Sequence, residues 1–594
     1  MFYANQESTM IKIAKTNIDI NNQEGIENQT LLGTWCMKNH FNYLEDQRKY
    51  KFVPYHWKNK EKYAQDSEYL DEIYENKLQD CSKHLNRIHN LDKDLRFWRI
   101  IVGPWLRFFI DALFDRYECI KLSQEYYENT EFTIHEYENK IPMDFNEFYE
   151  NLTSDFWNEI IFSECIKFQK VPHVFSKKKI SKKIQIRSKN PFKKFVENII
   201  QIYQRIISKF SRKITIISPY INLLQSIKIQ TLLKGFPYIM TFQHIAKPNE
   251  INFDIRDEIT FKSTHDDFES FLNTQIKQYL PQAYLEKFNE YNIVAKNNFP
   301  RKTKLIYTAN AYQSDDLFKI WAAHKTSNES KLIIGQHGGT FGLSLHNQTE
   351  KHQLKISDKF ISWGWQSQNF KNIVTKPSLK LYSHSKMSVM QNNKGKIVHV
   401  LGCVPRYFYN FFSMPIAGDY IDYLNDQIQF LKKLENSVID RIEIRHDASS
   451  NNWGWRVEDF FRINGFEKNV KTKNPNLINQ LNKSALSISS HNGTVPLETL
   501  ALNFPTIIFW DREYYQIRPD AKEYIDLLKD VGIFYDCPVM AAEHINSISN
   551  DISYWWNQKN VQQAVKLFTN KYALHSKDAL KILINFLNDE VRLN

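Results

Sequence analysis

The stretch from 485 to 498 reads ALSISSHNGTVPLE, in which an apolar segment leads through a small polar loop into a helix-forming segment. Ala485–Ser489 predicts a β-strand, and Val495–Leu502 predicts a helix with Pro496 in its first turn, where proline is tolerated. A strand, a glycine loop and a helix in this order indicate a parallel α/β sheet. The N–H groups and the positive dipole end at the start of the helix favour a bound phosphate.

Three residues of this stretch are candidate ligands of a phosphorylated substrate. Gly493 lets a phosphate approach the backbone closely, and the Thr494 hydroxyl can cap the helix or donate to the ligand. Glu498 lies four residues after Thr494 and hence on the same helix face, where its carboxylate can accept hydrogen bonds from a ribose diol. The alternative is an ordinary strand–turn–helix in which Thr494 only caps the helix.

A second glycine loop, GQHGGTFG at 335–342, follows the predicted strand Leu332–Ile334. Its glycines make a concavity with few side chains. His337 titrates near neutral pH, so it can act as a general base towards an acceptor hydroxyl or donate a hydrogen bond to a phosphate. The alternative is a structural histidine. Its neighbours in the loop are Gln336, Gly338 and Gly339.

Two further charged motifs follow predicted strands. Arg445 ends the strand Arg441–Arg445 and is a planar, permanent cation suited to phosphate, and Asp447 beside it offers a carboxylate base. The alternative is an ion pair between these two residues. The segment 511–513 (DRE) has acidic residues, but a surface loop is the simpler interpretation than a metal site. The sequence contains no His/Glu cluster with zinc spacing and no Walker-type phosphate loop.

The rest of the chain predicts two α/β halves joined near residue 390. Strand-like segments alternate with helix-like ones such as Ser314–His324, Leu345–Lys355 and Tyr420–Leu434, which predicts right-handed βαβ units. Ligands of such sheets bind beyond the carboxyl ends of the strands. The remaining predicted strands are Lys213–Ser218, Tyr238–Phe242, Leu305–Thr308, Lys359–Ser362, Ile397–Leu401 and Thr506–Trp510.

The N-terminal part, residues 40–210, is predicted to be mostly helical, with helices at Asp115–Tyr127 and Asn146–Gln169. The lysine-rich segment 177–183 (KKKISKK) is predicted to be a solvated loop. The alternative is a contact with acidic lipid headgroups or with a phosphorylated lipid-linked acceptor.

Length and composition indicate a folded chain of two or more domains. The 594 residues exceed what one hydrophobic core supports. The net charge of +11 suits an acidic partner, although a Lys- and Asn-rich genome explains it equally well. Six separated cysteines and a start without an apolar signal segment indicate the cytoplasm. Phe97–Phe114 carries Arg99, Arg107 and Asp111, so it predicts no membrane span.

Several motifs in one order along the chain resemble a known family. In the N-terminal half they are LGTWC (32–36), FWR (97–99), GPWL (103–106) and DR (115–116). In the middle they are QHGG (336–339) with Gly342, SDK (357–359) and SWGW (362–365). In the C-terminal half they are GT (493–494), LE (497–498), NFP (503–505) and FW (509–510). The chain is similar to the surface-polysaccharide (O-antigen-locus) transferases, which are related to GT-B glycosyltransferases.

The resemblance implies an α/β fold of GT-B type with two Rossmann-like lobes. Residues 1–390 would form the acceptor-side lobe with a helical insertion at about 40–210, and 391–594 would form the nucleotide-donor lobe and its C-terminal helices. His337 would face the cleft from the acceptor side, within the loop of Gln336, Gly338 and Gly339. The implied donor-binding residues are Ser489, Ser490, His491, Gly493, Thr494 and Glu498.

The implied reaction moves a sugar from a nucleotide donor to a surface-polysaccharide or lipid-linked acceptor without a metal or other cofactor. His337 or Asp447 would be the base, and Arg445 would stabilise the departing phosphate. A CMP-nonulosonic acid is the favoured donor, and a peripheral contact with the inner face of an anionic membrane is the alternative given above for the lysine-rich segment. The alternatives are a CDP-polyol phosphotransferase, and a protein that binds nucleic acid or glycan without catalysis.

Overall fold

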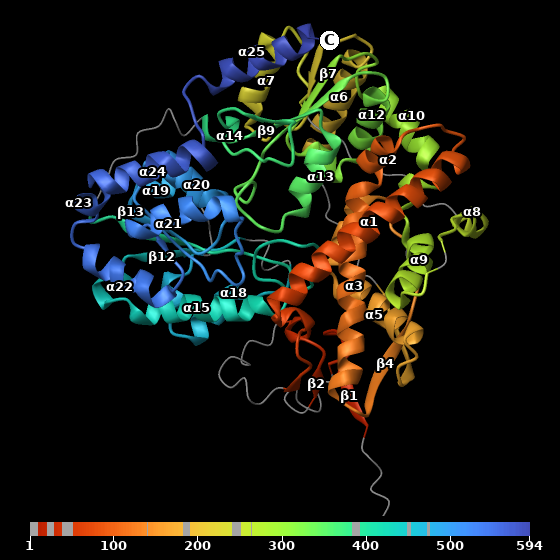
Figure 1. Ribbon diagram of the computed structural model, residues 1–594, viewed down its shortest axis with the longest axis horizontal. Helices are drawn as coiled ribbons and strands as arrows, with labels where there is room; N and C mark the ends of the chain where they lie inside the picture. Colours follow the sequence, from red (N-terminus) through yellow and green to blue (C-terminus); the bar gives the residue numbers. More distant parts are fainter. Residues whose placement is uncertain are drawn as a thin grey trace, which may run out of the picture.

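The computed structural model describes residues 10–20, 29–38, 51–138, 141–181, 191–239, 251–262, 264–382, 393–447, 453–471 and 476–593. These residues build three five-stranded sheets in which every strand pair is parallel. Figure 1 shows the three regions side by side, with the N-terminal part in red and orange, the middle in yellow and green, and the C-terminal part in blue. No helix among the described residues has the length and apolar composition needed to cross a bilayer.

The second sheet has the order β10-β9-β8-β7-β6, so its strands lie beside one another as they follow in the chain. Its strands are β6 (Ile214–Ile216), β7 (Leu305–Thr308), β8 (Lys331–Gly335), β9 (Lys359–Ser362) and β10 (Ile373–Thr375). The helices between and around them are α6 (Pro191–Ile207), α7 (Leu223–Leu232), α8 (Phe253–Asp257), α9 (Asp267–Tyr279), α10 (Phe288–Asn298), α11 (Ala311–Ser314), α12 (Asp316–Thr326), α13 (Gln348–Ile356) and α14 (Leu379–Tyr382).

The third sheet has the order β12-β11-β13-β14-β15, and the direction of winding reverses between β11 and β13. Ligands of such sheets bind where the order reverses, beyond the carboxyl ends of these two strands. Its strands are β11 (Lys396–Val400), β12 (Ile442–Arg445), β13 (Ser484–Ser489), β14 (Thr506–Phe509) and β15 (Phe534–Tyr535). Its helices are α15 (Asp419–Lys433), α16 (Asn436–Ile439), α18 (Val457–Ile463), α19 (Leu477–Leu481), α20 (Thr494–Ala501), α21 (Lys522–Asp530), α22 (Pro538–Ile548), α23 (Ile552–Trp556) and α24 (Lys559–Tyr572).

These two sheets confirm the expected α/β fold with two Rossmann-like units. Two short edge strands, β10 and β15, are absent from the sequence-based prediction because two or three residues carry too little pattern. The strand expected at Tyr238–Phe242 is not formed at Tyr238, which lies outside any strand, and residues 240–242 fall outside the described residues.

The first sheet is an addition that the sequence analysis does not predict. Its order is β3-β2-β1-β4-β5, with β1 (Ile11–Ala14), β2 (Thr30–Leu31), β3 (Lys51–Phe52), β4 (Thr130–Tyr137) and β5 (His173–Ile180). The region is mostly helical, as expected, with α1 (Lys60–Ile88), α2 (Leu95–Ile101), α3 (Gly103–Tyr126), α4 (Phe145–Leu152) and α5 (Asp155–Phe168). The helix expected at Asp115–Tyr127 is the second half of α3, and the one expected at Asn146–Gln169 is divided into α4 and α5.

The prediction of a loop at 177–183 is wrong for its first part, because Lys177–Ile180 belong to β5. This strand lies at the edge of the sheet and pairs with β4, so its backbone is hydrogen-bonded while the lysine side chains reach water. Ser181 follows the strand, and Lys182 and Lys183 lie outside the described residues.

The last helix, α25 (Ala579–Arg592), packs on the second sheet rather than on the third. Its buried Leu583 and Leu587 share one apolar cluster with Ile214 and Leu305 of β6 and β7. Figure 1 shows the blue α25 beside the yellow α7, while α24 stays with the third sheet. The chain therefore crosses back, and its C-terminal helix helps to tie the two lobes together.

Candidate functional site

The two glycine loops meet where the second and third sheets face each other. A Cβ atom on Gly339 would lie 2.1 Å from the carbonyl oxygen of Gly493 and 2.8 Å from the nitrogen of Thr494. Such distances exclude any side chain at 339, so glycine is required for this contact. Loops about 150 positions apart, each following a strand of a different parallel sheet, are thus in direct contact.

A set of polar contacts holds the segment after the 335–342 loop on the lobe of the third sheet. Asn492 donates from Nδ2 to Ser344 Oγ and to the carbonyl oxygen of Ser413, both at 3.0 Å. Arg518 donates from Nε to the carbonyl oxygen of Ser344 at 3.1 Å and forms an ion pair with Glu350. These groups are buried or half-buried, so their contacts fix the position of the two loops relative to each other.

In the loop 489–494, the side chains of the serines and the histidine point into the protein interior. Ser490 Oγ lies 2.7 Å from the hydroxyl of Tyr423, and the Ser489 hydroxyl is buried without a partner among the described residues. Gly493 donates its N–H to Nδ1 of His491 at 2.9 Å, which leaves the ring proton of the neutral imidazole on Nε2. Burial lowers the pKa of His491 to about 4, so this histidine is neutral near pH 7.

Thr494 is not the N-cap of α20, which corrects one of the two roles considered for it. Gly493 occupies the cap position without a side-chain hydrogen bond, and Thr494 is the first residue of the helix. A glycine cap leaves the first N–H groups of α20 without a competing side-chain acceptor, and these groups suit an anionic ligand.

Glu498, in the middle of α20, lies close to two cations. Its Oε1 is 3.3 Å from Nζ of Lys380, and its charge also acts on Arg445. Arg445 is half-buried and donates to Gln480 Oε1 at 3.3 Å. The exposed Asp447 interacts electrostatically with Arg445. The two cations are thus matched by two carboxylates, Glu498 and Asp447.

Lys380 is a site residue that the sequence analysis misses. It comes from the short helix α14, its Nζ lies 4.8 Å from the ring centre of Tyr220, and its charge also acts on His337. Lys380 therefore links the His337 loop to Glu498 across the two lobes. No local signal marks this lysine among the 78 lysines and arginines of the chain.

His337 is a neutral histidine in an aromatic environment. Its ring centre lies 5.6 Å from that of Tyr220 and 5.1 Å from that of Phe341. Burial, followed by the charge of Lys380, lowers its pKa to about 4. The ring hydrogen-bonds to the backbone of Ala309, and Nδ1 is buried and has no partner among the described residues. The lone pair of the neutral ring therefore resides on Nδ1.

Gln336 has a structural part in the same loop. Its Oε1 accepts from the N–H of Trp363 at 2.9 Å and from Nε1 of Trp365 at 2.8 Å. Its Nε2 donates to the carbonyl oxygen of Gly338 at 2.8 Å. Gln336 thereby joins the loops after β8 and β9 and shapes the glycine turn.

A small cavity opens beside this loop at the carboxyl end of the second sheet. Gln336 and Trp363 line it together with Tyr220, Lys376 and Lys380. Two lysines with aromatic walls suit a polar ligand that carries an anionic group.

Two buried clusters among the described residues have ligand atoms close enough for a metal ion. In the first (His56, Asp115 and Cys119), Asp115 already accepts from Tyr55 at 2.6 Å and from Arg116 at 2.8 Å. Burial raises the pKa of the Cys119 thiol well above its usual range. In the second (Asp19, His135 and Glu159), the ammonium of Lys15 lies 3.1 Å from Asp19 and 2.5 Å from Glu159. Cationic side chains therefore already compensate both clusters.

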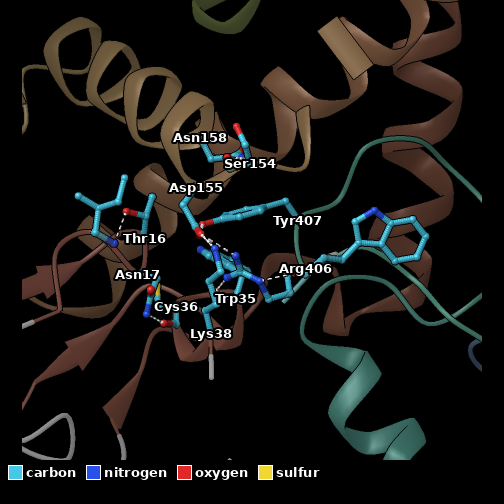
Figure 2. A network of polar contacts seen from close by, with 12 residues as sticks. Thr16, Asn17, Trp35, Cys36, Lys38, Ser154, Asp155, Asn158, Arg406 and Tyr407 are labelled. Carbon is cyan, nitrogen blue, oxygen red and sulfur yellow. Dashed lines mark hydrogen bonds and ion pairs between the residues drawn. The ribbon is translucent and has the colours of Figure 1, made fainter. Parts of the chain in front are cut away.

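The N-terminal region is joined to the lobe of the third sheet by an ionic junction (Figure 2). Asp155 at the start of α5 accepts from Arg406 Nη2 at 2.7 and 2.8 Å, from the Tyr407 hydroxyl at 2.7 Å and from Lys38 at 2.8 Å. Arg406 also donates to the carbonyl oxygen of Trp35. The LGTWC motif thus anchors the loop between β11 and α15 and lies outside the candidate site.

The model of the LIC12162 family transferases matches residues 15–587. No curated protein matches the chain. Among solved structures, a variant of the wall teichoic acid polymerase TagF is 10% identical, with 68% of this chain and 98% of that chain covered and a TM-score of 0.32. A glycosyltransferase from Rickettsia africae ESF-5 is 12% identical, with 65% and 99% covered and a TM-score of 0.33. A mutant of the O-GlcNAc transferase of Thermobaculum terrenum is 7% identical, with 84% and 92% covered and a TM-score of 0.32. Because the family model covers nearly the whole chain, the protein belongs to the LIC12162 family of transferases.

Proposed function

We propose that the protein is a glycosyltransferase that moves a sugar from a nucleotide-activated donor to a glycan acceptor between the second and third sheets. The observation that carries the proposal is the contact of Gly339 with Gly493. This contact brings a neutral histidine, a helix N-terminus and a carboxylate flanked by Lys380 and Arg445 to one place. These groups suit an acceptor hydroxyl, a phosphate and a ribose respectively.

In the proposed reaction the acceptor hydroxyl oxygen attacks the anomeric carbon and its proton passes to Nδ1 of His337. The bond between that carbon and the phosphate oxygen breaks, and the nucleotide leaves with the electron pair. The N–H groups of α20, Lys380 and Arg445 would stabilise the charge on the leaving phosphate, which is the largest catalytic contribution in many enzymes. Asp447 is the second candidate for the base.

The proposed donor is a CMP-nonulosonic acid, bound by Gly493, Thr494 and Glu498 with Ser489, Ser490 and His491 behind them. The proposed acceptor is a surface polysaccharide or lipid-linked glycan, with an anionic group in the cavity of Lys376 and Lys380. Fixed cations and helix N–H groups would replace a metal in this reaction, so activity should persist in EDTA.

The test begins with the melting temperature in the presence of CMP, CDP, UDP or GDP, because a ligand of the native state stabilises it by mass action. We expect the largest increase with CMP, and turnover with a CMP-nonulosonic acid. Turnover of CDP-glycerol would instead show a polyol phosphotransferase. Binding of no nucleotide, with tight salt-dependent binding of oligonucleotides, would overturn the proposal.

Glu498→Gln tests the donor side of the site. We expect the Kd of the nucleotide to rise about tenfold, because a charge-assisted hydrogen bond to the ribose is lost. Isothermal titration measures it, and the matched control is Glu513→Gln on the exposed loop after β14. An unchanged Kd in Glu498→Gln would exclude this carboxylate from the donor site.

A further inference from the structure

Helix α6 exposes a row of apolar side chains to solvent. Ile199, Ile202 and Ile206 are 51% to 59% exposed, while Gln204 and Ile207 on the opposite face are buried. A surface helix normally turns its apolar stripe to the core. The exposed side chains, which we call the α6 stripe, are Phe195, Val196, Ile199, Ile202, Ile206 and, just after the helix, Phe210.

The apolar surface continues onto the end of α7. The ring centre of Phe210 lies 5.7 Å from that of Phe236, and Phe236 and Leu232 are both more than half exposed. Contiguous apolar surface of this extent on a folded protein marks an interaction site. Helix α6 packs against α10 of the same lobe.

A strongly basic margin borders the stripe. Arg301 donates its N–H to the carbonyl oxygen of Ser208 at 3.1 Å, and Arg212 donates its N–H to that of Lys302 at 2.9 Å. Segments 208–213 and 301–304 therefore run side by side, and neither contains an acidic residue. Together they hold five exposed cations, Lys209, Lys213, Arg301, Lys302 and Lys304, while the half-buried guanidinium of Arg212 lies over the ring of Tyr238.

We propose that α6 docks the protein on an anionic lipid surface. The α6 stripe would enter the acyl-chain boundary and the basic margin would meet the headgroup phosphates, the combination by which interfacial helices bind membranes. A second copy of this chain is a less suitable partner for the stripe. The two cationic margins would face each other, and each copy carries a net charge of +11.

This proposal goes beyond the proposed function and places the membrane contact at α6 rather than at the lysine-rich segment 177–183. The test is co-sedimentation of the full chain with vesicles of phosphatidylcholine, alone or with about one third phosphatidylglycerol. We expect binding to the anionic vesicles that weakens with added salt. Because no sugar donor is present, the result is independent of the transfer reaction.

The stripe is tested by the triple variant Ile199→Ser/Ile202→Ser/Ile206→Ser, whose changed side chains are exposed and should leave folding intact. We expect its vesicle affinity to fall about tenfold or more. The matched control, Tyr554→Ser/Leu567→Ser, changes exposed apolar residues of α23 and α24 and should bind as the natural chain does. Equal affinity of the triple variant and the natural chain would overturn the proposal.

The basic margin is tested by Lys209→Glu/Lys302→Glu, which should remove the preference for anionic vesicles, with Lys566→Glu on the exposed side of α24 as control. Absence of binding by the natural chain to either vesicle would also refute the docking. So would a dimer in sedimentation equilibrium that the triple variant converts to a monomer, since the stripe would then be covered by a second copy.

Discussion

His337 is the residue whose chemistry depends most on its surroundings. In water its imidazole would be partly protonated at neutral pH, but burial and the charge of Lys380 lower its pKa to about 4. The ring is therefore fully neutral near pH 7 and can accept a proton on Nδ1. The low pKa makes it a weak base, so an acceptor hydroxyl would also need the electrostatic stabilisation that α20, Lys380 and Arg445 provide.

His337→Gln should lower kcat by about 100-fold or more while the KM for the donor stays nearly constant, because general-base catalysis is lost and donor contacts remain. In the natural enzyme, kcat should be constant between about pH 7.5 and pH 6, since the imidazole becomes protonated only near pH 4. Steady-state rates over this pH range check both expectations. A kcat that halves near the ordinary histidine pKa of about 6.5 would point to an unburied histidine instead.

The loops after β8 and β13 are the elements on which the site depends. Each belongs to a different sheet, and they touch through backbone atoms because Gly339 has no side chain. Around this contact, Asn492 and Arg518 bind Ser344 and hold the segment after the 335–342 loop on the lobe of the third sheet. The site is thus assembled by glycine geometry and by polar contacts between the lobes.

Gly339→Ala should destabilise the protein by about 1 to 3 kcal/mol and impair activity, because a methyl group would overlap Gly493 and push the loops apart. Gly338→Ala is the matched control, since its added methyl would meet only the ring of Phe341, at 3.3 Å. Urea unfolding and donor turnover of both variants measure the difference. Equal behaviour of the two variants would contradict the assigned contact.

At the scale of the whole molecule, several histidines are buried in their neutral form. Burial lowers the pKa of His399 to about 3, and the pKa values of His324 and His346 to about 4. The unfolded chain takes up protons near the usual value of about 6.5, whereas the folded chain does so only at much lower pH. Stability contributed by these groups is therefore lost as the pH falls from about 6.5 towards 4.

The free energy of unfolding, measured with urea, should fall by about 1 kcal/mol for each such histidine between about pH 7 and pH 5.5. His399→Phe should reduce this loss, because a phenyl ring fits the contacts with Phe430 and Phe509 and takes up no proton. His575→Phe, on the half-buried segment before α25, serves as control. A pH dependence that is identical in His399→Phe and the natural chain would refute this origin.

Much of the fold could be predicted from local pattern. The bounds of β7 and β9 are those expected from the sequence, and the strand–glycine–helix unit around Gly493 forms as its apolar run and Pro496 indicate. The sequence failed where elements are too short or depend on distant partners. β2 and β3 have two residues each, and the lysines of β5 form a strand only because β4 supplies its hydrogen bonds.

The sequence by itself determined the two parallel sheets and the loops that follow their strands, because side-chain periodicity and glycine placement act over a few residues. Only the tertiary structure decided that Gly339 touches Gly493, that Lys380 reaches both His337 and Glu498, and that α25 returns to the second sheet. The physical reason is that these contacts join segments far apart in the chain. Their formation depends on how whole lobes pack, which no local pattern encodes.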